Sequence, residues 1–333
     1  MRVAVYSTRP WDEQFLSAAN SGHDLLFLEA RLDRTTTPLA EGARAVCVFV
    51  NDVVDRSTIE GLHRHGIEFI ALRSAGFNHV DVRAALDHGV TVVRVPAYSP
   101  HAVAEHTVGL AITLNRRIHR AHNRVRDGDF RLIGLMGVDM FGKTAGIIGT
   151  GKIGQITAGI LQGFGMRVIA HDPYPNDTVA SMGIDYVDLD TLFAESHAIS
   201  LHCPLTPDTH HIIDAEAIEK MEKRPMVINT SRGALIDTAA AIEGLKSGQL
   251  GALAIDVYEE EGDLFFEDLS DTVIQDDVFS RLLTFPNVLV TGHQAFFTRE
   301  AVEQIAETTV ANLDALEDGR SPGTEVTADL VGS

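Results

Sequence analysis

Short apolar runs alternate with longer stretches of helical periodicity along the chain, and glycine and proline separate them. The runs have the nearly continuous Val, Ile, Leu and Ala composition of parallel strands that are buried on both faces. They cover residues 3–6, 45–50, 68–72, 91–95, 144–148, 167–170, 198–202, 226–229, 252–257 and 288–291. Such alternation is typical of β-α-β units. The sequence therefore predicts an α/β fold built on parallel sheets.

A long helical stretch separates the fourth apolar run from the fifth. Ser99 and Pro100 provide an N-cap and a first-turn proline, and apolar residues then recur at helical spacing as far as Val125. Gly128 can end this helix, so we expect one helix over about 99–126. Arginines fill its second half, where cations suit the helix dipole: Arg116, Arg117, Arg120, Arg124 and Arg126.

The spacing of the runs divides the chain in two. At about 150 residues per domain, 333 residues make a little over two domains. Four runs lie within residues 1–95, and the others begin at residue 144. The pattern turns helical again over 300–316, and this helix can return to the first unit. We predict one unit of 1–100 plus 298–333 and a second unit of 101–297.

Charge and composition argue against several functional classes of protein. The chain has 27 Lys and Arg against 47 Asp and Glu, a net charge of −20, whereas a nucleic-acid binder needs a basic footprint. No apolar run approaches the ~20 residues of a membrane-spanning helix, and the first residues lack the apolar core of a secretory signal. Cys47 and Cys203 make no disulfide framework. We expect a cytoplasmic protein without a nucleic-acid or membrane partner.

The strongest local signal is a glycine-rich turn after the strand predicted at 144–148. Its sequence GTGKIG contains Gly149, Gly151 and Gly154, with Lys152 and Ile153 between the last two. In a dinucleotide-binding turn the first glycine allows the tight bend, the second admits a pyrophosphate, and the third packs the helix on the strand. A helix is predicted from about residue 155 to 164, and its N-terminus would face the pyrophosphate.

An acidic residue completes this fingerprint. Asp172 ends the next predicted strand, 18 residues after Gly154. A carboxylate there can accept hydrogen bonds from the ribose hydroxyls of NAD and would repel the extra phosphate of NADP. We therefore predict that the chain binds NAD rather than NADP.

Polar residues follow three later strands, and the carboxyl ends of parallel strands share one edge of a sheet. Arg232 follows the strand at 226–229, Glu261 belongs to the acidic cluster after 252–257, and His293 follows 288–291. Hydride transfer to a 2-keto acid needs a cation for the carboxylate and a proton donor for the carbonyl oxygen. Arginine suits the first role and histidine the second, and a nearby carboxylate favours the protonated imidazole.

These residues lie in motifs that resemble the D-isomer-specific 2-hydroxyacid dehydrogenase family over nearly the whole chain. The motifs are GTGKIG, HCPLTPDTHHII, MVINTSRGALID, ALAIDVYEEE and VLVTGHQAF. The resemblance implies that Arg232 binds substrate, that His293 is the proton donor and that Glu261 pairs with His293. It also implies that Asp172 binds the ribose. Further residues match positions that contact NAD in the family: Cys203, Pro204, Thr209, Thr230, Ser231 and Asp256.

The same resemblance supplies candidates for substrate binding and the arrangement of the units. Ala75 and Gly76 match a loop whose backbone N–H groups hold the substrate carboxylate, and Tyr98 and Phe296 match substrate-facing aromatic positions. The family fold implies a flavodoxin-like catalytic unit, a Rossmann-like NAD-binding unit and an active site in the cleft between them. It also implies a homodimer or homotetramer assembled through the 101–126 region.

The segment between Glu261 and His293 indicates which members of the family the chain resembles. Its DLFFED run resembles the NAD-dependent D-lactate dehydrogenases of the family, which implies reversible reduction of pyruvate to D-lactate. The D configuration rests on the resemblance alone. Two alternatives stay open: a dehydrogenase for hydroxypyruvate, phenylpyruvate or a branched-chain 2-keto acid, and an NAD-sensing binding protein similar to the corepressors that share this fold.

The histidines give no reason to expect a metal. His101 and His106 are five residues apart, about 140° around a helix, so they would not share an ion. His210 and His211 are adjacent, and adjacent side chains are expected to point in different directions. We therefore predict no metal site.

Overall fold

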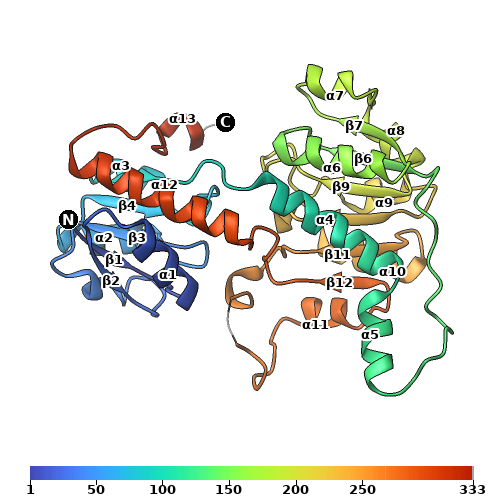
Figure 1. The fold of residues 1–333 in the computed structure, drawn as a ribbon, viewed down its shortest axis with the longest axis horizontal. Helices are drawn as coiled ribbons and strands as arrows, with labels where there is room; N and C mark the ends of the chain where they lie inside the picture. Colours follow the sequence, from blue (N-terminus) through green and yellow to red (C-terminus); the bar gives the residue numbers. More distant parts are fainter. Residues whose placement is uncertain (267, 332–333) are drawn as a thin grey trace. The chain divides into compact units, whose positions relative to one another are not determined.

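The computed structural model describes residues 1–266 and 268–331. The chain forms two compact units, one of Met1–Ser99 with Phe297–Ser333 and one of Pro100–Phe296. Each unit has one parallel sheet with helices on both faces (Figure 1), so the predicted α/β fold with two parallel-sheet units is confirmed. In the described part of the chain, no helix combines the length and the hydropathy that a membrane crossing requires.

The sheet of the first unit has five strands in the order β2-β1-β3-β4-β5. They are β1 (Arg2–Val5), β2 (Asp24–Phe27), β3 (Ala45–Val48), β4 (Phe69–Leu72) and β5 (Thr91–Val93). All neighbouring pairs are parallel, with Val5 opposite Cys47 and Cys47 opposite Ala71. This order is the flavodoxin-like one, with its switch point between β1 and β3.

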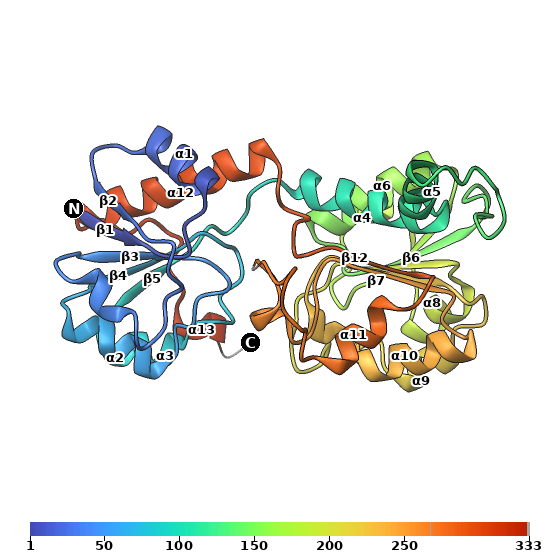
Figure 2. The same ribbon diagram turned by 90° about the horizontal axis from the view of Figure 1, so that it is seen from below.

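Alternation along these strands divides the core of the first unit into two layers. On β3, Ala45 and Cys47 pack on one face of the sheet, and Val46 and Val48 pack on the other. Helices α1 and α12 cover the first face, and α2 and α3 cover the second (Figure 2). The helices of this unit are α1 (Pro10–Ala19), the 3₁₀ helix η1 (Thr37–Ala40), α2 (Arg56–Arg64), α3 (Val82–Asp87), α12 (Arg299–Glu317) and α13 (Ala328–Val331).

The sheet of the second unit has seven parallel strands in the order β12-β11-β10-β9-β6-β7-β8. They are β6 (Thr144–Ile148), β7 (Arg167–His171), β8 (Asp185–Tyr186), β9 (Ala198–Leu201), β10 (Met226–Asn229), β11 (Ala252–Ile255) and β12 (Val288–Val290). The order reverses between β6 and β9, which is the switch point where open α/β sheets bind ligands. The candidate site residues of this unit follow the carboxyl ends of these strands.

Helices cover both faces of this second sheet, with α4 and α6 on one side and α8, α9, α10 and α11 on the other (Figure 2). The helices and 3₁₀ helices of this unit are α4 (Pro100–Asn115), α5 (Ile118–Arg126), α6 (Lys152–Gly163), α7 (Asp177–Ser181), α8 (Leu189–Glu195), α9 (Ala215–Glu219), η2 (Gly233–Leu235), α10 (Thr238–Ser247), η3 (Glu261–Asp263) and α11 (Asp277–Leu283).

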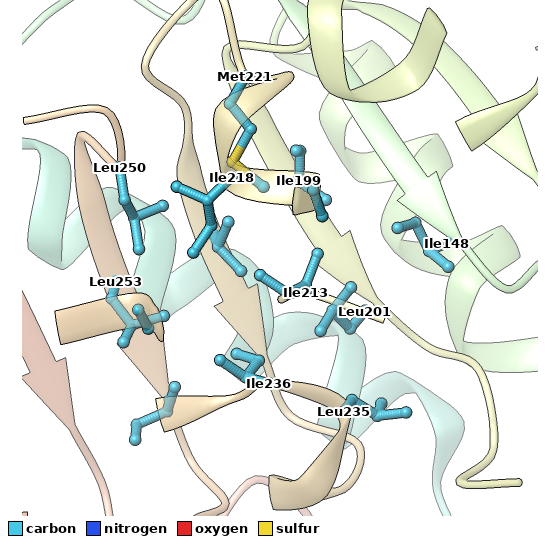
Figure 3. Packing of buried hydrophobic residues seen from close by; sticks show 14 of the residues in the cluster. Ile148, Ile199, Leu201, Ile213, Ile218, Met221, Leu235, Ile236, Leu250 and Leu253 are labelled. Atoms are coloured by element: carbon cyan, nitrogen blue, oxygen red, sulfur yellow. The ribbon is translucent and has the colours of Figure 1, made fainter. Parts of the chain in front are cut away.

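The core beneath α8–α11 is built from aliphatic side chains. Figure 3 shows Ile199, Leu201 and Leu253 from the sheet against Ile218 and Met221. Full burial of a side chain of this size contributes about 1.5–3 kcal/mol. This packing fixes the strands from whose ends the functional loops extend.

Two expectations for the secondary structure were wrong. Strands β2 and β8 were missed: β2 is a four-residue edge strand that is exposed or only half-buried, although residues 25–28 form an apolar run, and β8 is an edge strand of only two residues. The helix expected over 99–126 is two helices, since Arg117 adopts a left-handed conformation with φ of 51° between α4 and α5. Apolar residues do continue at helical spacing in α5, but Ile118 and Val125 are exposed. The apolar positions of α5 therefore do not form a buried face.

Candidate active site

The turn after β6 is built as a dinucleotide-binding turn requires. Gly149 has φ of 94°, and a Cβ on it would lie 2.5 Å from the backbone nitrogen of Cys203. A Cβ on Gly154 would lie 2.1 Å from the carbonyl oxygen of Gly149, whereas one on Gly151 would meet nothing within 4 Å. Two glycines are therefore needed for packing, and the third borders open space that a pyrophosphate can enter.

Helix α6 begins directly at this turn, at Lys152 rather than near residue 155 as expected. Gly151 is the N-cap and has no side chain that could bind the first-turn N–H groups. The N–H groups of Lys152 and Ile153 are therefore left at the positive end of the helix dipole. Together with the open space at Gly151, this arrangement fits the phosphates of NAD.

Asp172 lies directly after β7 and holds the turn in place. Its Oδ2 accepts hydrogen bonds from the backbone nitrogen of Thr150 at 2.7 Å and from Thr150 Oγ1 at 2.9 Å. Its Oδ1 accepts one from the backbone nitrogen of Tyr174 at 2.9 Å. A carboxylate can accept about four hydrogen bonds, so capacity for a ribose hydroxyl is left. Sequence reasoning missed Thr150, which the hydroxyl of Tyr186 also contacts at 2.9 Å.

Side-chain hydrogen bonds link the loops after β9 and β10. Ser231 Oγ donates to the carbonyl oxygen of Cys203 at 2.8 Å, and Thr209 Oγ1 donates to that of Pro204 at 2.6 Å. Thr230 Oγ1 lies 2.7 Å from the Thr107 hydroxyl of α4. Asp256 follows β11, and the other five residues that match the family's NAD contacts lie in these two loops after β9 and β10: Cys203, Pro204, Thr209, Thr230 and Ser231.

Two titratable side chains beside this turn stay uncharged at neutral pH. Burial raises the pKa of the Cys203 thiol to about 11, so it is not a thiolate nucleophile. Burial also lowers the pKa of His202 to about 4, and its Nε2 lies 2.8 Å from Ser200 Oγ. Neither side chain adds charge beside the glycine-rich turn.

The turn that carries Arg232 is fixed by a buried amide. Asn229, the last residue of β10, donates from Nδ2 to the carbonyl oxygen of Arg232 at 2.8 Å and accepts from the backbone nitrogen of Ser231 at 3.0 Å. Arg232 Nη1 donates to the carbonyl oxygen of Ser231 at 2.7 Å. A guanidinium has five N–H donors, so it can also bind an anion. Sequence reasoning missed Asn229, which is fully buried.

The structure brings His293 and Glu261 together. Nδ1 of His293 lies 2.8 Å from Oε1 of Glu261, and Oε2 of Glu261 accepts from the backbone nitrogen of Tyr258 at 3.0 Å. Because the carboxylate engages Nδ1, Nε2 is the ring nitrogen available for proton transfer. The side chains of His293 and Glu261 are 20% and 26% exposed, so the pair is sheltered without being closed to a substrate.

Asp256 holds the segment that carries His293. Its carbonyl oxygen accepts from the backbone nitrogen of His293 at 2.7 Å, and its carboxylate accepts from those of Gln294 at 2.9 Å and Ala295 at 2.8 Å. His293 has φ of 50°, a left-handed conformation that is costly for residues other than glycine. The anchoring by Asp256 keeps the histidine in that conformation.

The charge of Asp256 is maintained although the side chain is buried. Burial raises its pKa, but hydrogen bonds from His106, Thr291, Gln294 and Ala295 outweigh that effect and hold the pKa below its ordinary value. Nε2 of His106 lies 3.4 Å from Oδ1 of Asp256 and 3.2 Å from the hydroxyl of Thr291. His106 on α4 is thus a supporting residue that sequence reasoning did not identify.

The remaining substrate-binding candidates lie in loops and are described unit by unit. In the first unit, the carbonyl oxygen of Gly76 accepts from Ser74 Oγ at 2.7 Å, and that of Ala75 accepts from Arg94 Nη1 at 3.0 Å. These bonds fix the loop after β4. Tyr98 is half-buried near the end of the first stretch of this unit, and Phe296 is the half-buried last residue of the second unit.

One expectation about the histidines was wrong. The rings of His210 and His211 do not point in different directions: they stack with centroids 3.9 Å apart and an interplanar angle of 29°. The backbone explains this, since His211 has φ of 53°, which turns its side chain to the side of its neighbour. Nε2 of His211 lies 2.6 Å from Oε1 of Glu259.

Comparison with known proteins indicates the same kind of enzyme as the geometry of the site. Residues 108–295 match the family model described as the D-isomer specific 2-hydroxyacid dehydrogenase, NAD binding domain. The chain is 55% identical over 323 residues to the D-lactate dehydrogenase of Escherichia coli (strain K12), covering 96% of this chain and 98% of that protein.

Solved structures of other proteins align with nearly the full length of this chain. The pyruvate reductase of Chlamydomonas reinhardtii aligns with a TM-score of 0.93 and 47% identity, covering 97% of this chain and 98% of that one. The D-lactate dehydrogenase of Salmonella aligns with a TM-score of 0.87 and 55% identity, covering 98% and 100%. With its glycine-rich turn and its histidine–glutamate pair, the chain belongs to the D-isomer specific 2-hydroxyacid dehydrogenase family.

Proposed function

We propose that the protein is an NAD-dependent D-lactate dehydrogenase that reduces pyruvate to D-lactate reversibly. The observation that carries this proposal is the 2.8 Å contact between His293 and Glu261 in the unit that contains the NAD-binding turn. The choice of pyruvate is supported by full-length relatives that are named D-lactate dehydrogenase and pyruvate reductase.

The NAD-binding part of the proposal assigns a role to each element of the turn. The N–H groups at Gly151, Lys152 and Ile153 would bind the pyrophosphate, and Asp172 would bind the ribose. The loops at Cys203, Pro204, Thr209, Thr230, Ser231 and Asp256 would line the remainder of the cofactor site. When bound in its reduced form, the cofactor supplies the hydride that the reaction needs.

In the substrate half of the reaction, the side chains bind the acid and deliver a proton. The guanidinium of Arg232 binds the carboxylate of pyruvate, assisted by the N–H groups of Ala75 and Gly76. Protonated His293 gives its Nε2 proton to the carbonyl oxygen as that oxygen becomes a hydroxyl. Glu261 stabilises the imidazolium and orients the ring. In the oxidation of D-lactate, neutral His293 removes the hydroxyl proton.

The small size of pyruvate requires apolar walls around its methyl group. We propose that Tyr98 and Phe296 supply them. Aromatic rings fill space with few rotatable bonds, so they exclude longer side chains at low entropic cost.

We also propose that the protein is a cytoplasmic homodimer or homotetramer, as the family resemblance implies. An exposed apolar segment in the second unit supports self-association, because such surfaces mark sites of protein contact. Its most exposed side chains are Phe130 (74%), Leu132 (82%), Ile133 (79%), Met136 (90%) and Phe141 (79%).

A panel of keto acids tests the proposed activity. We expect NADH oxidation with pyruvate to have a higher kcat/KM than with hydroxypyruvate, phenylpyruvate or 2-ketoisocaproate, and NADPH to support little turnover. The product of the pyruvate reaction is expected to be oxidised only by a D-lactate-specific enzyme. A preference for a bulky acid would contradict the lactate assignment, and absence of turnover with all four would contradict an enzymatic role.

The choice between cofactors is expected to depend on the charge of Asp172. Replacing it with Asn keeps an oxygen for the N–H of Thr150 but removes the repulsion of the 2′-phosphate of NADP. We expect the ratio of kcat/KM for NADPH to that for NADH to rise. Asp177→Asn is the control, because it removes the same charge from an exposed position on α7. An unchanged ratio in Asp172→Asn would assign the preference to another feature.

A further inference from the structure

A cluster of three potential metal ligands lies outside the proposed catalytic residues. His210 and His211 follow β9, and Glu259 follows β11, all within the second unit. One ligand atom from each residue can be chosen so that all three lie within 4.8 Å of one another. Arg232, Glu261 and His293 are not members of this cluster.

The backbone brings the two imidazoles to the same side of the chain. Adjacent side chains in an extended segment point to opposite sides, but His211 is in the left-handed region with φ of 53°. Its backbone nitrogen donates to the carbonyl oxygen of Ala234 at 2.9 Å, and the bridge between Ile213 and Ile236 fixes the next residues. The fold therefore holds the backbone conformation that places the two rings side by side.

Glu259 is held in position by two partners. Its Oε1 lies 2.6 Å from Nε2 of His211, and its Oε2 accepts a hydrogen bond from the hydroxyl of Thr238 at 3.3 Å. Metal-binding carboxylates usually have such an outer partner, which orients them toward the ion. His210 is exposed, and the side chains of His211 and Glu259 are 30% and 25% exposed, so solvent can reach the cluster.

We propose that His210, His211 and Glu259 bind a divalent transition-metal ion of the Zn²⁺ type. Two imidazoles and one carboxylate are a ligand set that Zn²⁺ accepts, with water in the fourth position. Hard ions such as Mg²⁺ prefer all-oxygen sites and are not expected to compete. On binding, the ion takes the place of the hydrogen bond between His211 and Glu259, and each histidine binds as a neutral imidazole that keeps its proton on the other ring nitrogen. Because Glu259 is two residues from Glu261, the ion would also brace the loop of the catalytic pair.

Titration of the intact, chelator-stripped protein with Co²⁺ tests this site through the visible absorption of the bound ion. We expect one Co²⁺ per chain, displaced by Zn²⁺ but not by excess Mg²⁺. His210→Ala removes an exposed ligand and leaves the contact between His211 and Glu259 intact, so the variant should fold normally. Its affinity for Co²⁺ is expected to fall by at least about tenfold, and Glu259→Gln should behave in the same way.

His122→Ala removes an exposed histidine of α5 in the same unit and is the matched control. We expect it to bind Co²⁺ as tightly as the wild type, and Zn²⁺ to raise the Tm of the wild type and of this control but not of His210→Ala. The proposal is overturned if the wild type does not bind Co²⁺, or if His210→Ala retains wild-type affinity. Equal losses in His210→Ala and His122→Ala would overturn it as well.

Discussion

Replacing His293 with Asn is expected to lower kcat for pyruvate reduction by about 10²- to 10⁴-fold, the usual contribution of a general acid. The variant retains the fold, because Asn tolerates the left-handed backbone that the structure imposes at this position, with φ of 50°. The loss should appear in kcat more than in KM, since the variant leaves Arg232, the proposed ligand of the carboxylate, unchanged. Steady-state kinetics with pyruvate and NADH measure both parameters.

Two further variants test whether the loss of activity is specific to His293 and its partner. His122→Asn changes an exposed histidine of α5 and should leave kcat unaltered. Glu261→Gln removes the carboxylate 2.8 Å from Nδ1 of His293, so the protonated imidazole loses its charged partner. The kcat for pyruvate reduction should then fall, because the ring of His293 loses the contact that orients it. A kcat for His293→Asn within about tenfold of the wild type would exclude His293 as the proton donor, and a wild-type kcat in Glu261→Gln would exclude Glu261 as its partner.

Gly154→Ala is expected to destabilise the protein and to abolish tight NADH binding. The added Cβ would lie 2.1 Å from the carbonyl oxygen of Gly149, and backbone atoms cannot move aside as a flexible side chain can. Overpacking of this kind costs about 1–3 kcal/mol even where some relaxation is possible. Denaturant unfolding measures the loss of stability, and quenching of NADH fluorescence measures the loss of affinity.

Glycines of the same turn and helix provide the comparison. Gly163→Ala in α6 meets nothing within 4 Å and should raise the free energy of unfolding by about 0.5–1 kcal/mol. Gly151→Ala likewise meets nothing within 4 Å, so it should keep its stability while weakening NADH binding at the pyrophosphate. If Gly154→Ala is as stable as the wild type and binds NADH normally, the close packing of the turn is not required.

The parts of the fold that sequence reasoning predicted are those with a local physical cause. Strands such as β6 and β10 are buried on both faces, so their apolar runs are continuous and visible. The glycines of the turn at 149–154 and the polar residues at strand ends follow from the same rule, because parallel strands place their carboxyl ends at one edge. The contact between His293 and Glu261 lies at this edge, although 32 residues separate them in the chain.

The features that could not be predicted depend on partners distant in sequence. Thr150, Asn229 and His106 look like ordinary polar residues until the fold brings each to a specific hydrogen bond. Arg117 and His211 both have a left-handed backbone, and residue type does not reveal this, since only a few per cent of non-glycine residues adopt it. Edge strand β8 is only two residues long and carries no pattern.

The net charge of −20 affects how the site attracts its ligands. Pyruvate and NADH are both anions, and the overall field repels them. Attraction therefore has to be local, and the groups proposed for it are the guanidinium of Arg232 and the N–H groups at the start of α6. Raising the ionic strength screens the overall repulsion.

The discontinuous first unit has a consequence for synthesis on the ribosome. One face of its sheet, at Val3, Val5, Ala45 and Cys47, is covered by Val310 and Leu313 of α12 and their neighbours. These covering residues are translated after the whole of Pro100–Phe296 has been made. Domains generally fold as units, and the second unit is contiguous, so the later-made unit can complete its core first. The nascent chain thus carries this sheet face with only α1 to shield it through most of translation, and holding chaperones could bind there during that time.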